Sequence, residues 1–90
     1  MKPIVFTRHA LVQMQERGAT QEEVELSIGT GEPEPAKLGR QAFRKNFNFE
    51  KIWKGRYYTV KQVMSVVAEE QDSLFVVTVY VFYFGGNHEN

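Results

Sequence analysis

The chain has 90 residues, a formal net charge of zero and no cysteine. Its length is that of one small domain, and its 42% of hydrophobic residues are enough for a folded core. Without cysteine, a disulfide framework and a thiolate metal site are excluded, and we expect neither a cofactor nor a metal. Because no apolar run reaches the roughly 18 residues of a membrane span, we expect a cytoplasmic protein with no membrane contact.

The first residues predict a short strand followed by a helix. Residues 4–6 are apolar and suit a strand, and Thr7 can cap a helix over residues 8–17. Gly18 is a suitable helix stop. The residues expected to form the buried face of this helix are Ala10, Leu11 and Met14.

A second helix follows directly. Thr20 and Glu23 have the spacing of a capping box, so the helix begins at this point and ends near Gly29 to Gly31. Val24 and Ile28 form its apolar face. The two prolines of Glu32–Pro35 cannot continue a helix and predict an extended loop.

Three strands are expected in the second half, over residues 42–53, 56–68 and 74–84. Lys54-Gly55 is a plausible two-residue hairpin turn, and the second turn lies around Glu70–Ser73. The predicted fold class is therefore α+β, with two helices packed on one face of a small antiparallel sheet and the order β-α-α-β-β-β. One domain is expected over residues 1–84, with a frayed tail over residues 85–90.

Counting outward from the two turns assigns side chains to the faces of the sheet. One hairpin pairs Trp53 with Arg56 and the other pairs Glu70 with Ser73, and the two registers agree. The face expected to pack on the helices carries Phe47, Phe49, Val60, Met64, Val66, Phe75, Val77, Val79 and Val81. The opposite face is expected to carry Arg44, Asn46, Asn48, Thr59, Lys61, Ser65, Thr78 and Tyr80.

Charge is unevenly distributed along the chain. Residues 41–68 carry six Lys or Arg residues and one acidic residue, Glu50, whereas residues 69–90 carry four acidic residues and no Lys or Arg. This asymmetry predicts either a local anion-binding surface or a solvated basic hairpin.

Four short motifs carry a resemblance to a known family. They are Phe6-Thr7-x-His9-Ala10, Glu16-Arg17-Gly18, Tyr57-Tyr58-x-x-Lys61-x-Val63 and Val76-Val77-Thr78-Val79-Tyr80. Over roughly residues 6–84 the chain resembles a prokaryotic family of domains of unknown function that is placed with the RelE/ParE and BrnT toxin superfamily.

The resemblance implies a single RelE-like domain and a toxin-like ribonuclease of a type II toxin–antitoxin pair. The implied partners are a cognate antitoxin protein and RNA or the ribosome, although the ParE branch instead targets gyrase. The alternative is a non-catalytic protein–protein interaction module on the same fold. The sequence leaves open whether the protein is an enzyme and whether it forms an oligomer.

RNA cleavage by attack of the 2′-hydroxyl needs a base, an acid and cations around the phosphate. We expect His9, Lys61 and Tyr80 to be the catalytic residues, because histidine is the usual side chain for proton transfer at neutral pH and the other two share the polar face. Arg44 and Tyr57 are the expected RNA-binding residues, one for a phosphate and one for base stacking.

Each candidate also has a structural interpretation. His9 can tie the first helix to the strands by a hydrogen bond, and Lys61 can be a solvated surface residue. Tyr80 can make a cross-strand aromatic contact. Arg17, at the helix end, can bond the final carbonyls or anchor the second helix through Glu23.

Overall fold

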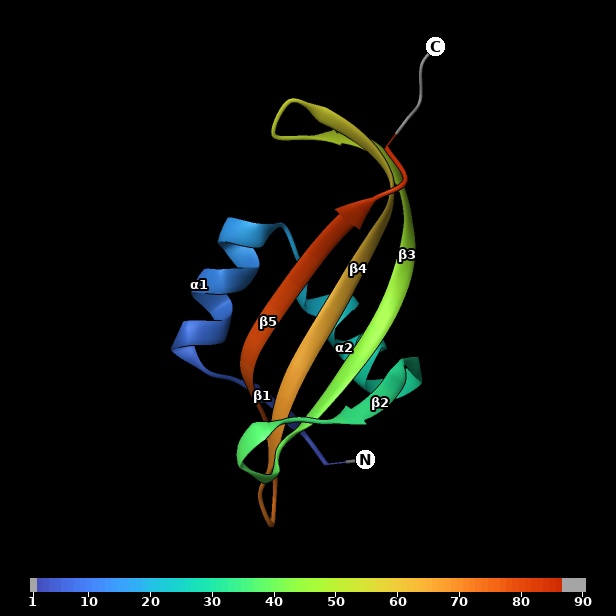
Figure 1. Ribbon diagram of the computed structural model, residues 1–90. Coiled ribbons are helices and arrows are strands. Elements are labelled where there is room, and N and C mark those ends of the chain that lie inside the picture. The colour runs from blue at the N-terminus through green and yellow to red at the C-terminus, as the bar shows by residue number, and fades with distance from the viewer. Residues whose placement is uncertain (1, 87–90) are drawn as a thin grey trace.

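The computed structural model describes residues 2–86 and shows two helices against a five-stranded sheet (Figure 1). The elements in chain order are β1 (Ile4–Phe6), α1 (Arg8–Arg17), α2 (Gln21–Thr30), β2 (Glu32–Pro35), the 3-10 turn η1 (Lys37–Gly39), β3 (Gln41–Trp53), β4 (Arg56–Glu69) and β5 (Leu74–Phe84). The α+β fold with both helices on one face is confirmed. The part of the expected frayed tail that spans residues 87–90 lies outside the described residues.

The sheet has the strand order β1-β5-β4-β3-β2. β1 pairs parallel to β5, and the other neighbours pair antiparallel, so the sheet is mixed. Helix α1 packs mainly on β5, and α2 packs on β4 and β3. The long strands β3 and β4 therefore extend beyond the helices, as Figure 1 shows at the upper end of the sheet.

Both helices have the ends that the sequence predicts. Thr7 Oγ1 accepts a hydrogen bond from Ala10 N at 3.1 Å, and Gly18 closes α1 in the left-handed conformation with φ of 85°. In α2, the Thr20 hydroxyl accepts from the Glu23 amide while the Glu23 carboxylate accepts from the Thr20 amide. The capping box is therefore present in full.

The buried face of α1 differs from the prediction at one position. Ala10 and Met14 are buried, but Leu11 is 41% exposed and Gln13 is buried instead. Residues 10, 13, 14 and 17 form one helical stripe toward β5, and Leu11 lies at the side of that stripe. Burial of the polar Gln13 side chain is tolerated because its Oε1 accepts a hydrogen bond from Val79 N at 2.8 Å.

The segment Glu32–Pro35 is a strand and not a loop. It pairs antiparallel with the start of β3, with Pro33 opposite Phe43 and Pro35 opposite Gln41. Proline lacks an N–H group and is tolerated in a strand where that group would face solvent, so β2 suits the edge of the sheet. The two prolines exclude a helix here, but they do not prevent the segment from pairing as a strand with β3 along one of its edges.

The register of both hairpins is displaced by β-bulges. The first hairpin starts with Trp53 opposite Arg56, as expected, but an irregularity between Asn48 and Lys51 then brings Phe47 opposite Lys61. Glu50, in this irregular stretch, has φ of 50°. A second irregularity at Val66/Val67 shifts the pairing of β4 with β5 by one residue. Each extra residue shifts the pairing by one position, so both registers counted from the turns are wrong beyond the bulges.

These shifts reverse the faces of β4. Lys61 and Ser65, which were expected on the polar face, are 6% and 0% exposed and lie on the helix side with Val79. The face prediction for Lys61 and Ser65 is therefore wrong. Met64 alternates with these residues and lies on the opposite face, as do three further residues expected in the core: Val60, Val66 and Phe75. The predicted faces hold for Phe47, Val79, Val81, Arg44, Asn46, Thr78 and Tyr80.

The corner between the helices is packed closely against the far end of the sheet. The Tyr83 hydroxyl donates a hydrogen bond to Arg17 O at 2.7 Å, and the Tyr83 and Trp53 rings stack with centroids 5.1 Å apart. A Cβ atom on Gly18 would come within 2.5 Å of the Tyr83 hydroxyl and 2.8 Å of the Trp53 ring. Gly18 is therefore required both for its positive φ and for the close approach of these two rings.

Burial, with the neighbouring Glu23 carboxylate, raises the pKa of Tyr83 from 10.0 to about 12. Because the folded-state pKa exceeds the unfolded value, neutral Tyr83 contributes stability that is complete below pH 10 and is lost as the pH rises toward 12. We expect the free energy of unfolding, measured by urea denaturation, to fall less steeply over this range in Tyr83→Phe than in the natural protein. The exposed Tyr80, changed to Phe, is the control and should keep the steep fall. An equally steep fall in Tyr83→Phe would contradict the assignment.

Candidate nucleic-acid interface

The face of the sheet away from the helices carries a row of exposed aromatic side chains. Tyr80, Phe82 and Phe84 occupy alternate positions of β5 and are 40%, 41% and 45% exposed. Their alternation with the buried Val79 and the partly buried Val81 places them on one face. We call this surface the open face, since no helix of the described residues packs on it.

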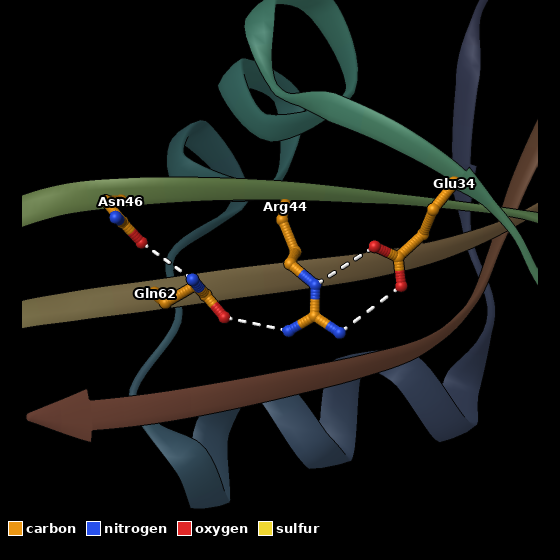
Figure 2. A network of polar contacts seen from close by, with 4 residues as sticks. All are labelled: Glu34, Arg44, Asn46 and Gln62. Carbon is orange, nitrogen blue, oxygen red and sulfur yellow. Dashed lines mark hydrogen bonds and ion pairs between the residues drawn. The ribbon is translucent and has the colours of Figure 1, made fainter.

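Arg44 is held in place on the open face by a polar network (Figure 2). Its Nε and Nη2 atoms donate to the two carboxylate oxygens of Glu34 at 3.2 and 3.3 Å, and its Nη1 donates to Gln62 Oε1 at 2.9 Å. Gln62 Nε2 in turn donates to Asn46 Oδ1 at 2.8 Å. The bidentate contact with Glu34 orients the guanidinium plane. The network joins β2, β3 and β4.

Two aromatic rings of the open face are flanked by guanidinium groups. Tyr80 and Phe82 have ring centroids 6.4 Å apart and planes inclined by 17°. The Arg44 guanidinium lies 5.8 Å from the centre of the Phe82 ring, and that of Arg17 lies 5.3 Å from the centre of the Tyr80 ring. Arg17 reaches this position from α1 around the sheet edge, where its Nη1 also donates to Val79 O at 2.8 Å. The arrangement combines flat apolar surfaces with fixed positive charge.

A hollow adjoins Tyr80 on the open face. It has a volume of ≈ 440 Å³ and lies between the segment after β2 and the strands β4 and β5. Lys37 and Arg40 contribute two cations to its lining. The lining also contains one acidic residue, Glu34, which is paired with Arg44, and small or apolar residues that include Ala42, Met64, Val66 and Thr78. A planar group that carries negative charge nearby would fit such a site.

The structure brings only some of the predicted site residues together. Arg44 and Tyr80 lie on the open face, but Lys61 lies on the opposite side of the sheet. His9 is exposed in the first turn of α1, and no hydrogen bond or ion pair joins it to the other described residues. Tyr57 is half-buried in β4 near the hairpin turn, opposite Ile52.

Lys61 makes a buried connection between the sheet and the helix corner. Its ammonium donates to Gly18 O at 2.8 Å and lies 3.0 Å from Glu23 Oε1. The Lys61 side chain is 8% exposed and that of Glu23 is 20% exposed, and the ammonium also lies 5.2 Å from the centre of the Phe49 ring. The expected contact of Arg17 with Glu23 is replaced by this ion pair. These contacts give Lys61 a structural role.

Three residues of the open face are absent from the sequence-derived set. Gln62 was missed because the register counted from the turns did not include the bulges, whereas Phe82 lies two residues after Tyr80 on the same face of β5 and was left out although this alternation indicates it. Arg17 was given a structural role, although it belongs to the Glu16-Arg17-Gly18 motif, and that motif was the available signal. A correct face for β4 would have put Gln62 beside Arg44.

The chain matches a domain of unknown function, DUF4258, over residues 6–81 and belongs to this family. The match does not connect the chain to the RelE/ParE or BrnT toxins. No match was found among curated proteins or among solved structures. In residues 2–86, none of the helices is long and apolar enough to cross a membrane.

The buried position of Lys61 predicts a large effect on stability. Lys61→Ala removes the ammonium that pairs with the Glu23 carboxylate and bonds to the Gly18 carbonyl, so we expect a loss of about 3 kcal/mol in the free energy of unfolding. Lys51, which is exposed on the same hairpin, is the matched control, and Lys51→Ala should change this free energy by no more than about 0.5 kcal/mol. Urea denaturation measures both. Equal stabilities of the two variants would show that the ion pair does not hold the corner.

Proposed function

We propose that this domain binds single-stranded RNA on its open face, as a toxin-like, RNA-targeting protein. The observation that supports this most directly is the pair of exposed rings, Tyr80 and Phe82, flanked by Arg17 and Arg44. Unpaired bases stack on exposed aromatic rings, and arginine binds phosphate or stacks on a base. Both kinds of group are within one short stretch of β5 and its neighbours.

The polar residues beside the rings support a single strand as the ligand. Gln62, Asn46 and Thr78 place amide and hydroxyl groups on the same face, and such groups can bond to the edges of unstacked bases. A duplex hides those edges within its base pairs. A splayed single strand therefore uses this surface more fully than a double helix does.

The ion pair with Glu34 orients the Arg44 guanidinium but does not occupy all of its N–H groups. The guanidinium makes three hydrogen bonds in the network, which is fewer than its N–H groups allow. Its remaining N–H groups are available to a phosphate oxygen. Lys37 and Arg40 at the nearby hollow, together with Arg17, add cations along the same face. These residues supply local positive charge on a chain whose net charge is zero.

RNA binding on the open face should depend on both aromatic and cationic side chains. With a fluorescently labelled single-stranded RNA oligonucleotide at low salt, Phe82→Ala should weaken binding about tenfold through loss of one stacked base. Arg44→Gln should weaken binding and reduce the slope of log affinity against log salt concentration by about one unit. The matched controls are Val12→Ala, an exposed apolar position on α1, and Lys51→Gln, an exposed cation on the hairpin. If the natural protein does not bind, or the controls weaken binding equally, the proposal is wrong.

Cleavage of the bound strand is tested separately through His9. Its imidazole is exposed, and histidine is the side chain most often used for general acid–base catalysis, which is the role proposed for it in a ribonuclease. We expect His9→Ala to abolish cleavage of the labelled RNA on a sequencing gel and to leave its affinity unchanged. Gln15→Ala, an exposed change on the same helix, is the control. Cleavage that persists in His9→Ala would exclude this role, and an intact RNA with the natural protein would leave a binding protein without ribonuclease activity.

A further inference from the structure

The outer edge of β5 is only partly covered. β1 pairs with Leu74–Val76, and beyond this point two side chains of α1 take over the edge. Gln13 Oε1 accepts from Val79 N, and Arg17 Nη1 donates to Val79 O, each at 2.8 Å. The backbone N–H and C=O groups of Val79 therefore point away from β4.

The same direction follows for two further residues of β5. The pairing of β4 with β5 is regular from Val60–Phe84 to Val66–Thr78, so outward-pointing backbone groups recur at every second residue. Val81 and Tyr83 therefore also direct their N–H and C=O groups away from β4. In residues 2–86, no other strand pairs with this part of β5, and no loop or side chain bonds to these groups. They form a free strand edge.

The edges formed by β2 and by the free part of β3 are protected against an added strand. β2 contains Pro33 and Pro35, which remove two N–H donors. Beyond β2, the outer edge of β3 carries Lys45 and Lys51 and is interrupted by the bulge after Asn48. Prolines, lysines and bulges are the usual devices that prevent strand addition. The edge at Val81 and Tyr83 has none of them.

A hollow with positive charge lies beside this free edge. The tip of the β3–β4 hairpin bends across the end of the sheet on the side of β5 (Figure 1). Between the tip and β5 is a hollow of ≈ 690 Å³, lined by Trp53, Lys54, Gly55, Arg56 and Tyr58 together with residues 81–83. The lining contains two cations and no acidic side chain. Within the described residues, neither Lys54 nor Arg56 forms an ion pair.

We propose that β5 accepts an extended, acidic segment of another protein as an additional strand of the sheet. The segment exchanges backbone hydrogen bonds with Val81 and Tyr83, and its carboxylates meet Lys54 and Arg56. Because side chains of a strand alternate between faces, every second residue of the segment can direct its side chain toward Lys54 and Arg56. This site shares Phe82 with the contacts of Arg44 on the open face, but Lys54 and Arg56 belong to it alone.

Charge distinguishes this partner from a second copy of the chain. A copy would offer its own β5, but residues 74–84 contain no charged side chain that could neutralise Lys54 and Arg56. A nucleic acid has no regular row of backbone N–H and C=O groups to pair with Val81 and Tyr83. An acidic peptide satisfies both the free edge and the two cations.

The test uses a library of short random peptides displayed on phage and selected against the whole protein. We expect enriched sequences without proline and with Asp or Glu at alternate positions. A synthetic peptide of the enriched sequence should bind about tenfold more weakly to the double variant Lys54→Asn, Arg56→Gln. Its affinity for Lys51→Gln should match that for the natural protein. Enriched peptides without acidic residues, or no effect of the double variant, would overturn the proposal.

The backbone contact is tested independently of charge. Binding of the synthetic peptide should slow amide hydrogen exchange at Val81 and Tyr83 in the natural protein, and Val81→Pro should abolish peptide binding. The Val81 N–H is not part of the β4 ladder, so proline removes only the outward donor. If Val81→Pro does not fold, the exchange measurement decides. Unchanged exchange at both residues, or a dimer that the peptide cannot dissociate, would contradict strand addition by a peptide.

Discussion

The ammonium group of Lys61 ties the corner between the two helices to the middle strand of the sheet. It bonds to the carbonyl of Gly18, at the end of α1, and pairs with Glu23, in the first turn of α2. Glu23 also accepts the amide hydrogen of Thr20, so one carboxylate serves the helix cap and the ion pair. A charge in this position has few alternatives, because an unpaired buried ammonium is costly. The contact therefore selects one arrangement of both helices on β4.

The orientation of Lys61 also determines what the open face contains. With Lys61 and Ser65 directed toward the helices, the intervening residues Gln62 and Met64 must point the other way. Ser65 supports the same orientation, since its hydroxyl lies 2.7 Å from that of Ser27 in α2. Buried polar contacts of β4 with the helices thus place an amide beside Arg44 on the exposed side. The candidate interface depends on contacts made on the opposite side of the sheet.

Helix α1 contributes to both proposed surfaces through a single strand residue. Gln13 and Arg17 bond to the backbone of Val79, which closes the edge of β5 at that point and leaves Val81 and Tyr83 open. The same Arg17 side chain then lies against the ring of Tyr80. A polar face of a helix is therefore used as an edge cover and as part of the open face. RNA binding and peptide binding are proposed at neighbouring positions on β5.

The elements whose signals are local could be predicted from the amino-acid sequence alone. The caps at Thr7 and Thr20 and the stop at Gly18 were predicted correctly, and the limits of the three long strands were predicted to within one residue, because each depends on a few adjacent residues. The motifs placed the chain among domains of unknown function, as the family match confirms. Arg44 and Tyr80 were correctly assigned to the face away from the helices, because they follow the alternation of their own strands.

The face of β4 could not be predicted from the sequence, and neither could the burial of Lys61 or the composition of the candidate interface, because these depend on long-range contacts. The two hairpin registers agreed with each other and were both wrong beyond their bulges, near Glu50 and near Val77. The agreement was misleading because each bulge adds one residue, and strand side chains alternate with a period of two. What selects the bulged register is the contact of β4 with the helices, and those contacts join residues about 40 positions apart in the chain. The sequence of β4 contains no local pattern that predicts these contacts with the helices.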